Sequence, residues 1–167
     1  WAGTACVVAA AWVWTLGASS FAALAFDGPD SPASTTAVLW WLLWSLLGTG
    51  AAVALVWRRR HAFVICVVTA AVAAVFPVSF FAPWWALVWV FATERWRNVA
   101  IGAGATTVAI TATLWRDHDR GSEAILALTE ESTGQPAVLH PVGYLAVGLL
   151  ALVVAAAIGL VRRYQTN

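Results

Sequence analysis

Long apolar runs separated by short polar connections make up most of the chain. An α-helix needs about 20 apolar residues to cross a hydrocarbon core of roughly 30 Å. The pattern therefore predicts an all-α, polytopic helix bundle with about six membrane spans, all within one transmembrane domain, 1–167. The predicted spans are 2–26, 36–57, 62–77, 80–94, 99–115 and 141–161.

The connections between the runs contain turn-forming and charged residues. Asp27–Pro32 is a dense cluster of turn residues, and Arg58–His61 is short enough to make its two flanking helices antiparallel neighbours. The longest polar stretch, 116–140, is predicted to be an external loop. The run at 84–93 reaches only about 15 Å as a helix, so the fourth span either begins earlier, near Val78, or is tilted and re-entrant.

Composition supports a membrane environment. Apolar residues are 62% of the chain and charged residues only 10%, so a water-soluble protein of this length could not cover its surface with polar groups. The lipid bilayer is therefore the expected partner. The basic residues are all arginine and are scattered over short connections, which is not the pattern of a nucleic-acid-binding surface.

The distribution of arginine predicts the orientation. Seven arginines fall on connections at one side of the predicted bundle and two at the other, and arginine-rich connections face the cytoplasm. The N-terminus and C-terminus are thus predicted to be cytoplasmic, in a multi-pass protein of the plasma or bacterial inner membrane. The inner arginines are Arg58, Arg59, Arg60, Arg95, Arg97, Arg162 and Arg163; the outer ones are Arg116 and Arg120.

Catalytic and cofactor chemistry has little support in the sequence. No ionisable residue falls in the middle of a predicted span, which argues against a proton-coupled transporter and an intramembrane hydrolase. Cys6 and Cys66 lie in apolar runs without a CxxC or Cys/His cluster, so they are expected to act as small apolar residues. No cofactor and no metal are predicted, and whether the protein is an enzyme stays open.

Tryptophan is unusually frequent, with 12 residues. An aromatic belt at the membrane interfaces is the simpler interpretation. The alternative is a ligand pocket near the outer leaflet, which would hold an apolar or cationic molecule. Its candidate residues are Trp40, Trp41, Trp44, Phe80, Phe81, Trp84, Trp85 and Trp89.

Two other patterns are weaker signals. Asp117, His118, Asp119 and His140 could bind a metal or sense pH, but a solvated acidic loop is the favoured interpretation because their spacing matches no defined metal motif. Small residues recur at four-residue spacing in 151–159 and would let that helix approach a neighbour closely, either in the same chain or in a second copy.

The chain resembles the membrane-embedded input region of actinobacterial sensor histidine kinases. The resemblance rests on the arginine-rich turn Trp57–Ala62, on Phe91–Ala100 at the opening of the next span, and on Val161–Asn167 as the start of an exit helix. It implies several short spans ahead of a cytoplasmic dimerisation and phosphotransfer unit. These residues contain no phosphoacceptor-histidine region and no ATP-binding glycine boxes, so kinase activity would require further chain.

Three functions are therefore kept as hypotheses. A sensory and signal-transducing module, the input domain of a two-component sensor kinase, predicts a homodimer. An accessory subunit of a transporter, respiratory or secretion complex predicts a larger membrane-protein partner. A small transporter or channel would need a polar path through threonines such as Thr106, Thr107, Thr111 and Thr113. Because the sequence begins at Trp1 and lacks methionine, we expect it to belong to a longer protein.

Overall fold

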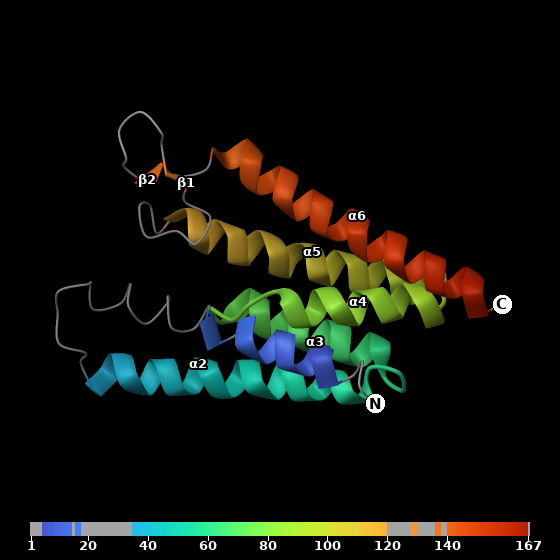
Figure 1. Ribbon diagram of the computed structural model, residues 1–167, viewed down its shortest axis with the longest axis horizontal. Helices are drawn as coiled ribbons and strands as arrows, with labels where there is room; N and C mark the ends of the chain where they lie inside the picture. Colours follow the sequence, from blue (N-terminus) through green and yellow to red (C-terminus); the bar gives the residue numbers. More distant parts are fainter. Residues whose placement is uncertain are drawn as a thin grey trace.

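The computed structural model describes residues 5–14, 16–17, 35–119, 128–129, 136–137 and 140–166, and these are almost entirely helical (Figure 1). A short helix, Ala5–Trp14, precedes the main helices. The further elements are α2 (Thr35–Ala54), the 3-10 turn η1 (Leu55–Trp57), α3 (Ala62–Val75), α4 (Phe81–Thr93), α5 (Trp96–Asp119), β1 (Leu128–Thr129), β2 (Pro136–Ala137) and α6 (Pro141–Thr166).

Three of these helices are long and apolar enough to cross a membrane. They span Thr35–Trp57, Trp96–Asp119 and Pro141–Gln165. The helices α3 and α4 have 14 and 13 residues, which corresponds to about 20 Å each and is shorter than a hydrocarbon core of roughly 30 Å. Helical structure is therefore confirmed for all the described apolar runs, and a membrane-spanning length for three of them.

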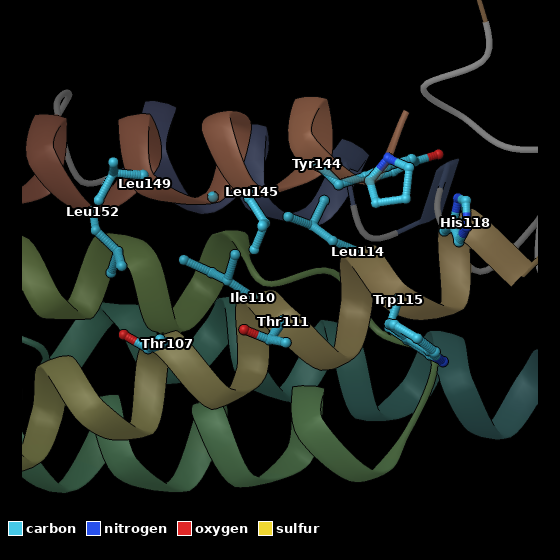
Figure 2. A pocket seen from close by; sticks show the side chains of 12 residues that line it. Thr107, Ile110, Thr111, Leu114, Trp115, His118, Tyr144, Leu145, Leu149 and Leu152 are labelled. Atoms are coloured by element: carbon cyan, nitrogen blue, oxygen red, sulfur yellow. The ribbon is translucent and has the colours of Figure 1, made fainter. Parts of the chain in front are cut away.

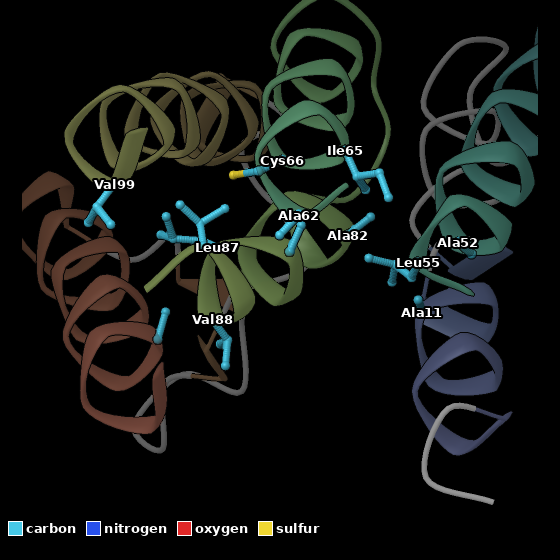
Figure 3. Close-up of a cluster of buried hydrophobic side chains, with 13 residues drawn as sticks. Ala11, Ala52, Leu55, Ala62, Ile65, Cys66, Ala82, Leu87, Val88 and Val99 are labelled. Atoms are coloured by element: carbon cyan, nitrogen blue, oxygen red, sulfur yellow. The ribbon is translucent and has the colours of Figure 1, made fainter. Parts of the chain in front are cut away.

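Helix α4 lies at the centre of the bundle. It packs against α3, α5 and α6, and Figure 3 shows these helices arranged around it. Ala86, Leu87, Val88 and Val90 have no exposed surface. Because α4 is apolar on every side, it can be buried by several neighbours at once. Helix α2 lies farther out, where the N-terminal helix packs on it through Ala11 and through a hydrogen bond from Trp12 Nε1 to Thr49 Oγ1 (3.2 Å).

The small residues of α6 face α4 within the same chain. Ala155 is fully buried, and the carbonyl of Ala151 accepts a hydrogen bond from Trp84 Nε1 (2.6 Å). A Cβ atom at Gly159 would lie 2.7 Å from the carbonyl oxygen of Val88 and still closer to Cβ of Phe91. The close approach predicted from the four-residue spacing is confirmed, and its partner is α4.

Helical structure extends into the first residues of the segment predicted to be an external loop. Helix α5 continues four residues past Trp115, through Asp119, so 116–119 are helical. The reason is a long-range contact: the guanidinium of Arg116 reaches the C-terminal end of α3 and donates to the carbonyls of Phe76 (2.6 Å), Ala73 (2.8 Å) and Ala74 (2.5 Å). The carbonyls of Ala73 and Ala74 lack partners within their own helix, and the carbonyl of Phe76 also accepts from the amide of Val78 (2.7 Å). A cation at this end also complements the helix dipole.

Smaller differences concern the other boundaries. Helix α5 begins at Trp96, three residues before the predicted span, and α6 continues to Thr166, beyond the predicted end at 161. Within 116–140, β1 and β2 form a short antiparallel pair, in which Leu128 lies opposite Ala137. Of the predicted first span, 2–26, residues 5–14 and 16–17 are helical, and the other residues lie outside the described ranges.

Candidate functional site

A cavity of about 390 Å³ lies between α5 and α6 (Figure 2). The two helices diverge toward the end where α5 finishes and α6 begins (Figure 1), and the cavity occupies the space between them. Cavities of this size are typical of small-molecule sites. Its walls are formed by Thr107, Ile110, Thr111, Leu114, Trp115, His118, Pro141, Tyr144, Leu145, Gly148, Leu149 and Leu152.

The walls follow helical periodicity on both sides. On α6, Leu145, Gly148, Leu149 and Leu152 are spaced three or four residues apart and share one face. Figure 2 shows leucines of α6 opposite Ile110 of α5. Because Gly148 has no side chain, it lets the helices meet: a Cβ there would lie 3.2 Å from Cγ2 of Ile110.

One end of the cavity is polar. The phenol of Tyr144 donates a hydrogen bond to Oδ2 of Asp117 (3.2 Å), and both residues are buried. The ring of His118 lies edge-on to Tyr144, with centroids 5.4 Å apart, and next to Trp115. Nδ1 of His118 is buried and has no hydrogen-bond partner among the described residues. The site thus combines apolar walls with a polar group at one end, which suits an apolar or amphiphilic molecule.

The eight aromatic residues of the predicted pocket do not line this cavity. On α2, Trp40 and Trp44 stack on one another, with centroids 6.0 Å apart. On α4, Phe81 and its two tryptophan neighbours form a second group with centroids 5.6 to 6.4 Å apart. Trp41 is half-buried on α2. Trp84 and Trp85 are the two tryptophans of the α4 group. Phe80 packs against the buried cluster of Ile110, Leu114 and Tyr144. Trp89 lies among arginines.

The four polar candidates separate in the structure. Asp117 and His118 lie at the polar end of the cavity, whereas Asp119 is exposed at the last residue of α5. His140 is exposed and precedes α6, where its carbonyl accepts a hydrogen bond from the amide of Gly143 (2.7 Å). No three His, Cys, Asp or Glu side chains within the described ranges are placed to hold a metal ion.

Three of the four threonines of α5, Thr106, Thr107 and Thr113, contact protein groups through their hydroxyls. The hydroxyls of Thr107 and Thr113 donate to carbonyls one turn earlier in their own helix, at Ala103 and Ala109 (2.8 Å each). Thr106 is buried, and its Oγ1 lies 3.4 Å from Sγ of Cys66. Thr107 and Thr111 also line the cavity, and the polar path of a small transporter or channel stays a prediction.

Sequence reasoning missed Tyr144 and the leucine walls of the cavity. The spacing of Tyr144, Gly148 and Leu152 marks one face of α6, and this signal was available in the sequence. The depth of the gap depends on how far α5 and α6 diverge, and no local pattern encodes that distance.

Comparisons with known proteins give no match: no family model, no curated protein and no solved structure is significantly similar to the chain.

Proposed function

We propose that this chain is a membrane-embedded sensory module that binds an apolar or amphiphilic molecule between α5 and α6. The observation that carries the proposal is the position of the cavity. It lies along the first turns of α6, a single 26-residue helix whose last turns are fixed to α4 at the opposite end of the bundle. A molecule that enters the cavity would therefore displace the first turns of α6, and the rigid helix would transmit this movement to its last turns at the arginine-rich surface.

The contacts of α6 support a movement of the whole helix about its C-terminal contact with α4. Gly159 lies directly against the side chain of Phe91 and the backbone carbonyl of Val88 on α4. One turn later, Nη1 of Arg163 donates to the carbonyls of Glu94 (3.1 Å) and Phe91 (3.4 Å). Near the cavity, α6 contacts α5 around Gly148 and through the hydrogen bond from Tyr144 to Asp117. Packed helices shift as rigid bodies rather than bending continuously, so a ligand that separates α5 from α6 would tilt α6 about its contact with α4.

The proposal includes the topology expected from the sequence, with about six spans and both termini in the cytoplasm. The short helix α4 would cross in the interior of the bundle, where protein surrounds it, whereas α3 also has an outer face with the exposed side chains of Val64, Val68 and Val75. A reporter fused within Asp117–Glu131 is expected to be external. A cytoplasmic signal there would contradict the topology.

The input region of a sensor histidine kinase would use the same arrangement, since α6 would continue as the exit helix toward a cytoplasmic dimer. The accessory-subunit alternative is supported by the exposed leucines of α2, for example Leu39 and Leu46, which could face a larger membrane protein as well as lipid. Mass spectrometry of the intact protein after gentle extraction separates these alternatives. A longer chain paired with itself supports the sensor, and a chain of this size bound to larger proteins supports the subunit.

Ligand binding can be tested with two neighbouring leucines of equal exposure. Leu149 lines the cavity and Leu150 does not, although 64% and 63% of their surfaces are exposed. Leu149→Trp is expected to narrow the cavity and abolish binding of dansyl-labelled undecanoate to the protein in detergent, measured by fluorescence. Leu150→Trp is the control and should bind like the wild type. Equal binding by both variants would contradict the proposed site.

A further inference from the structure

The cavity between α5 and α6 opens on one side of the bundle. Ile110 and Leu114, which form its floor, are only 2% and 7% exposed. Its rim is formed by Trp115, Leu145 and Leu149, whose surfaces are 64 to 70% exposed. Both walls belong to helices that are long and apolar enough to cross a membrane. An apolar opening on such helices faces hydrocarbon in a bilayer, so a molecule would enter from the membrane rather than from water.

The cavity is long and narrow. Its lining extends from Thr107 to His118 on α5 and from Pro141 to Leu152 on α6, which corresponds to about 16 Å along each helix. A volume of about 390 Å³ over that length gives a mean cross-section of roughly 25 Å². This width accommodates one extended hydrocarbon chain and excludes two chains side by side.

The polarity of the lining changes along this axis. Figure 2 shows His118 and Tyr144 at one end of the cavity and Thr107 and Leu152 at the other. The hydroxyl of Thr107 donates to the carbonyl of Ala103, so the second end offers little polarity. His118 lies in the last turn of α5, whereas Thr107 lies near the middle of that helix. The polar end is therefore near the membrane surface and the apolar end is deeper, which is also the orientation of a lipid in a bilayer.

His118 supplies a hydrogen-bonding group for a lipid head. Its Nδ1 is buried and has no hydrogen-bond partner among the described residues, and rotation about the soft Cβ–Cγ torsion would turn this nitrogen toward the cavity. The hydroxyl of Tyr144 is already engaged by Asp117. None of the residues that line the cavity is Asp, Glu, Lys or Arg. A small head with carboxyl or hydroxyl oxygens suits this end better than a phosphate, which favours charged, paired donors.

We propose that the cavity binds a single-chain lipid, with its hydrocarbon chain between α5 and α6 and its carboxyl or hydroxyl head beside His118. Fatty acids and monoacylglycerols share this chemistry. The chain would make dispersion contacts with Ile110, Leu114 and Leu149, and the head would give the unpaired nitrogen a partner. The proposal rests on the proposed function, because it names the class of molecule that this cavity binds and the direction in which the molecule lies.

The direction of the chain is tested by photo-crosslinking in nanodiscs of phosphatidylcholine, whose lipids are two-chain competitors in large excess. Two dodecanoic acids are used, with a diazirine next to the carboxyl group or at the end of the chain, and labelled residues are mapped by peptide mass spectrometry. The first should label the segments around His118 and Tyr144, and the second those around Thr107 and Leu152. Leu149→Trp should lose both labels, whereas the control Leu150→Trp should keep them.

The head contact is tested by substitution. His118→Phe should bind dodecanoic acid about fivefold more weakly, the value of one hydrogen bond. His140→Phe is the matched control, because His140 is exposed and does not line the cavity, and it should bind like the wild type. Unlabelled dodecanoic acid and monododecanoylglycerol should both displace the label, and the stronger competitor identifies the preferred head.

Three results would overturn the proposal. Labelling of the same end by both analogues, or in reversed order, would contradict the direction. Loss of cavity labelling in the nanodiscs would assign the cavity to a chain of bilayer phospholipid. Equal affinities of His118→Phe and His140→Phe would remove the head contact; if His118→Phe does not fold, the labelling of the wild type decides. In each case dansyl-labelled undecanoate can still bind in detergent, which leaves the proposed function intact, whereas no binding of that probe to the wild type contradicts both.

Discussion

The two long interfaces of α6 differ in how closely the helices approach. Against α4, Ala155 is fully buried, the carbonyl of Ala151 accepts from Trp84, and the backbone at Gly159 lies so close to α4 that a Cβ would be 2.7 Å from the carbonyl oxygen of Val88. Against α5, Leu145, Leu149 and Leu152 line an open cavity. Without a hydrophobic driving force between helices in lipid, close packing of small residues supplies much of the association energy. The same helix can therefore be firmly attached on one side and separable on the other.

The largest expected effect comes from breaking the close interface. Gly159→Leu places side-chain atoms where Phe91 and Val88 already lie, and such overpacking should reduce the free energy of unfolding by roughly 3 kcal/mol. Thermal unfolding in detergent, followed by size-exclusion chromatography, measures the change. Gly104→Leu is the control, since a Cβ at Gly104 has no neighbour within 4 Å. If both variants unfold alike, α6 does not depend on its contact with α4.

The next largest effect is expected at Arg116, which holds the end of α5 beside the cavity. Arg116 ties the end of α5 to three carbonyls at the end of α3. Arg116→Gln should destabilise the protein by about 2 kcal/mol, because three hydrogen bonds from a charged donor are lost and of the three carbonyls that of Phe76 keeps a backbone donor, the amide of Val78. Arg97→Gln, an exposed position on the same helix, should change unfolding little. Equal unfolding temperatures for the two variants would contradict the capping role of Arg116.

The polar end of the cavity gives a smaller effect. Tyr144→Phe removes the hydroxyl that donates to Asp117 and leaves a buried carboxylate oxygen with one donor fewer. A loss of about 1 kcal/mol is expected. Tyr164→Phe tests the same chemical change at an exposed tyrosine and should have no measurable effect on thermal unfolding. A wild-type transition for Tyr144→Phe would mean that this hydrogen bond does not stabilise the cavity.

The smallest expected effect is the difference in stability between two substitutions at adjacent tryptophans of α4, Trp84 and Trp85. Nε1 of Trp84 donates to Ala151 of α6, whereas Nε1 of Trp85 has no partner among the described residues. Trp84→Phe should therefore cost about 0.6 kcal/mol more than Trp85→Phe, the typical value of a hydrogen bond between membrane helices. Chemical unfolding in detergent can resolve this difference. Equal losses would assign the stability to ring packing alone.

These comparisons also show what the sequence could and could not predict. The apolar runs predicted the helices of the described chain, and the spacing of Ala155 and Gly159 predicted a close helix contact, because both signals are local. The end of α5 was assigned to a loop because 116–119 are polar. Their helical structure depends on the carbonyls of α3 and on Tyr144, which are distant in the sequence.

The placement of tryptophans shows the same limit. A sequence can assign Trp89 to a membrane depth, but the arginines around it come from the turn after η1 and from α6. The cavity likewise depends on the divergence of two helices that are connected through 120–139. Contacts between residues far apart in the sequence therefore determine where the cavity lies and which arginines surround Trp89.

The most direct test of the central claim measures whether a ligand moves α6 at the open interface. Spin labels at Asp119→Cys and Val142→Cys, both exposed at the cavity end, would be introduced after replacing Cys6 and Cys66 by alanine. Pulsed electron paramagnetic resonance then gives the distance between α5 and α6 with and without dansyl-labelled undecanoate. A longer distance at saturation, absent in Leu149→Trp, is the predicted result. An unchanged distance in the presence of bound probe would contradict the claim that α6 transmits occupancy of the cavity.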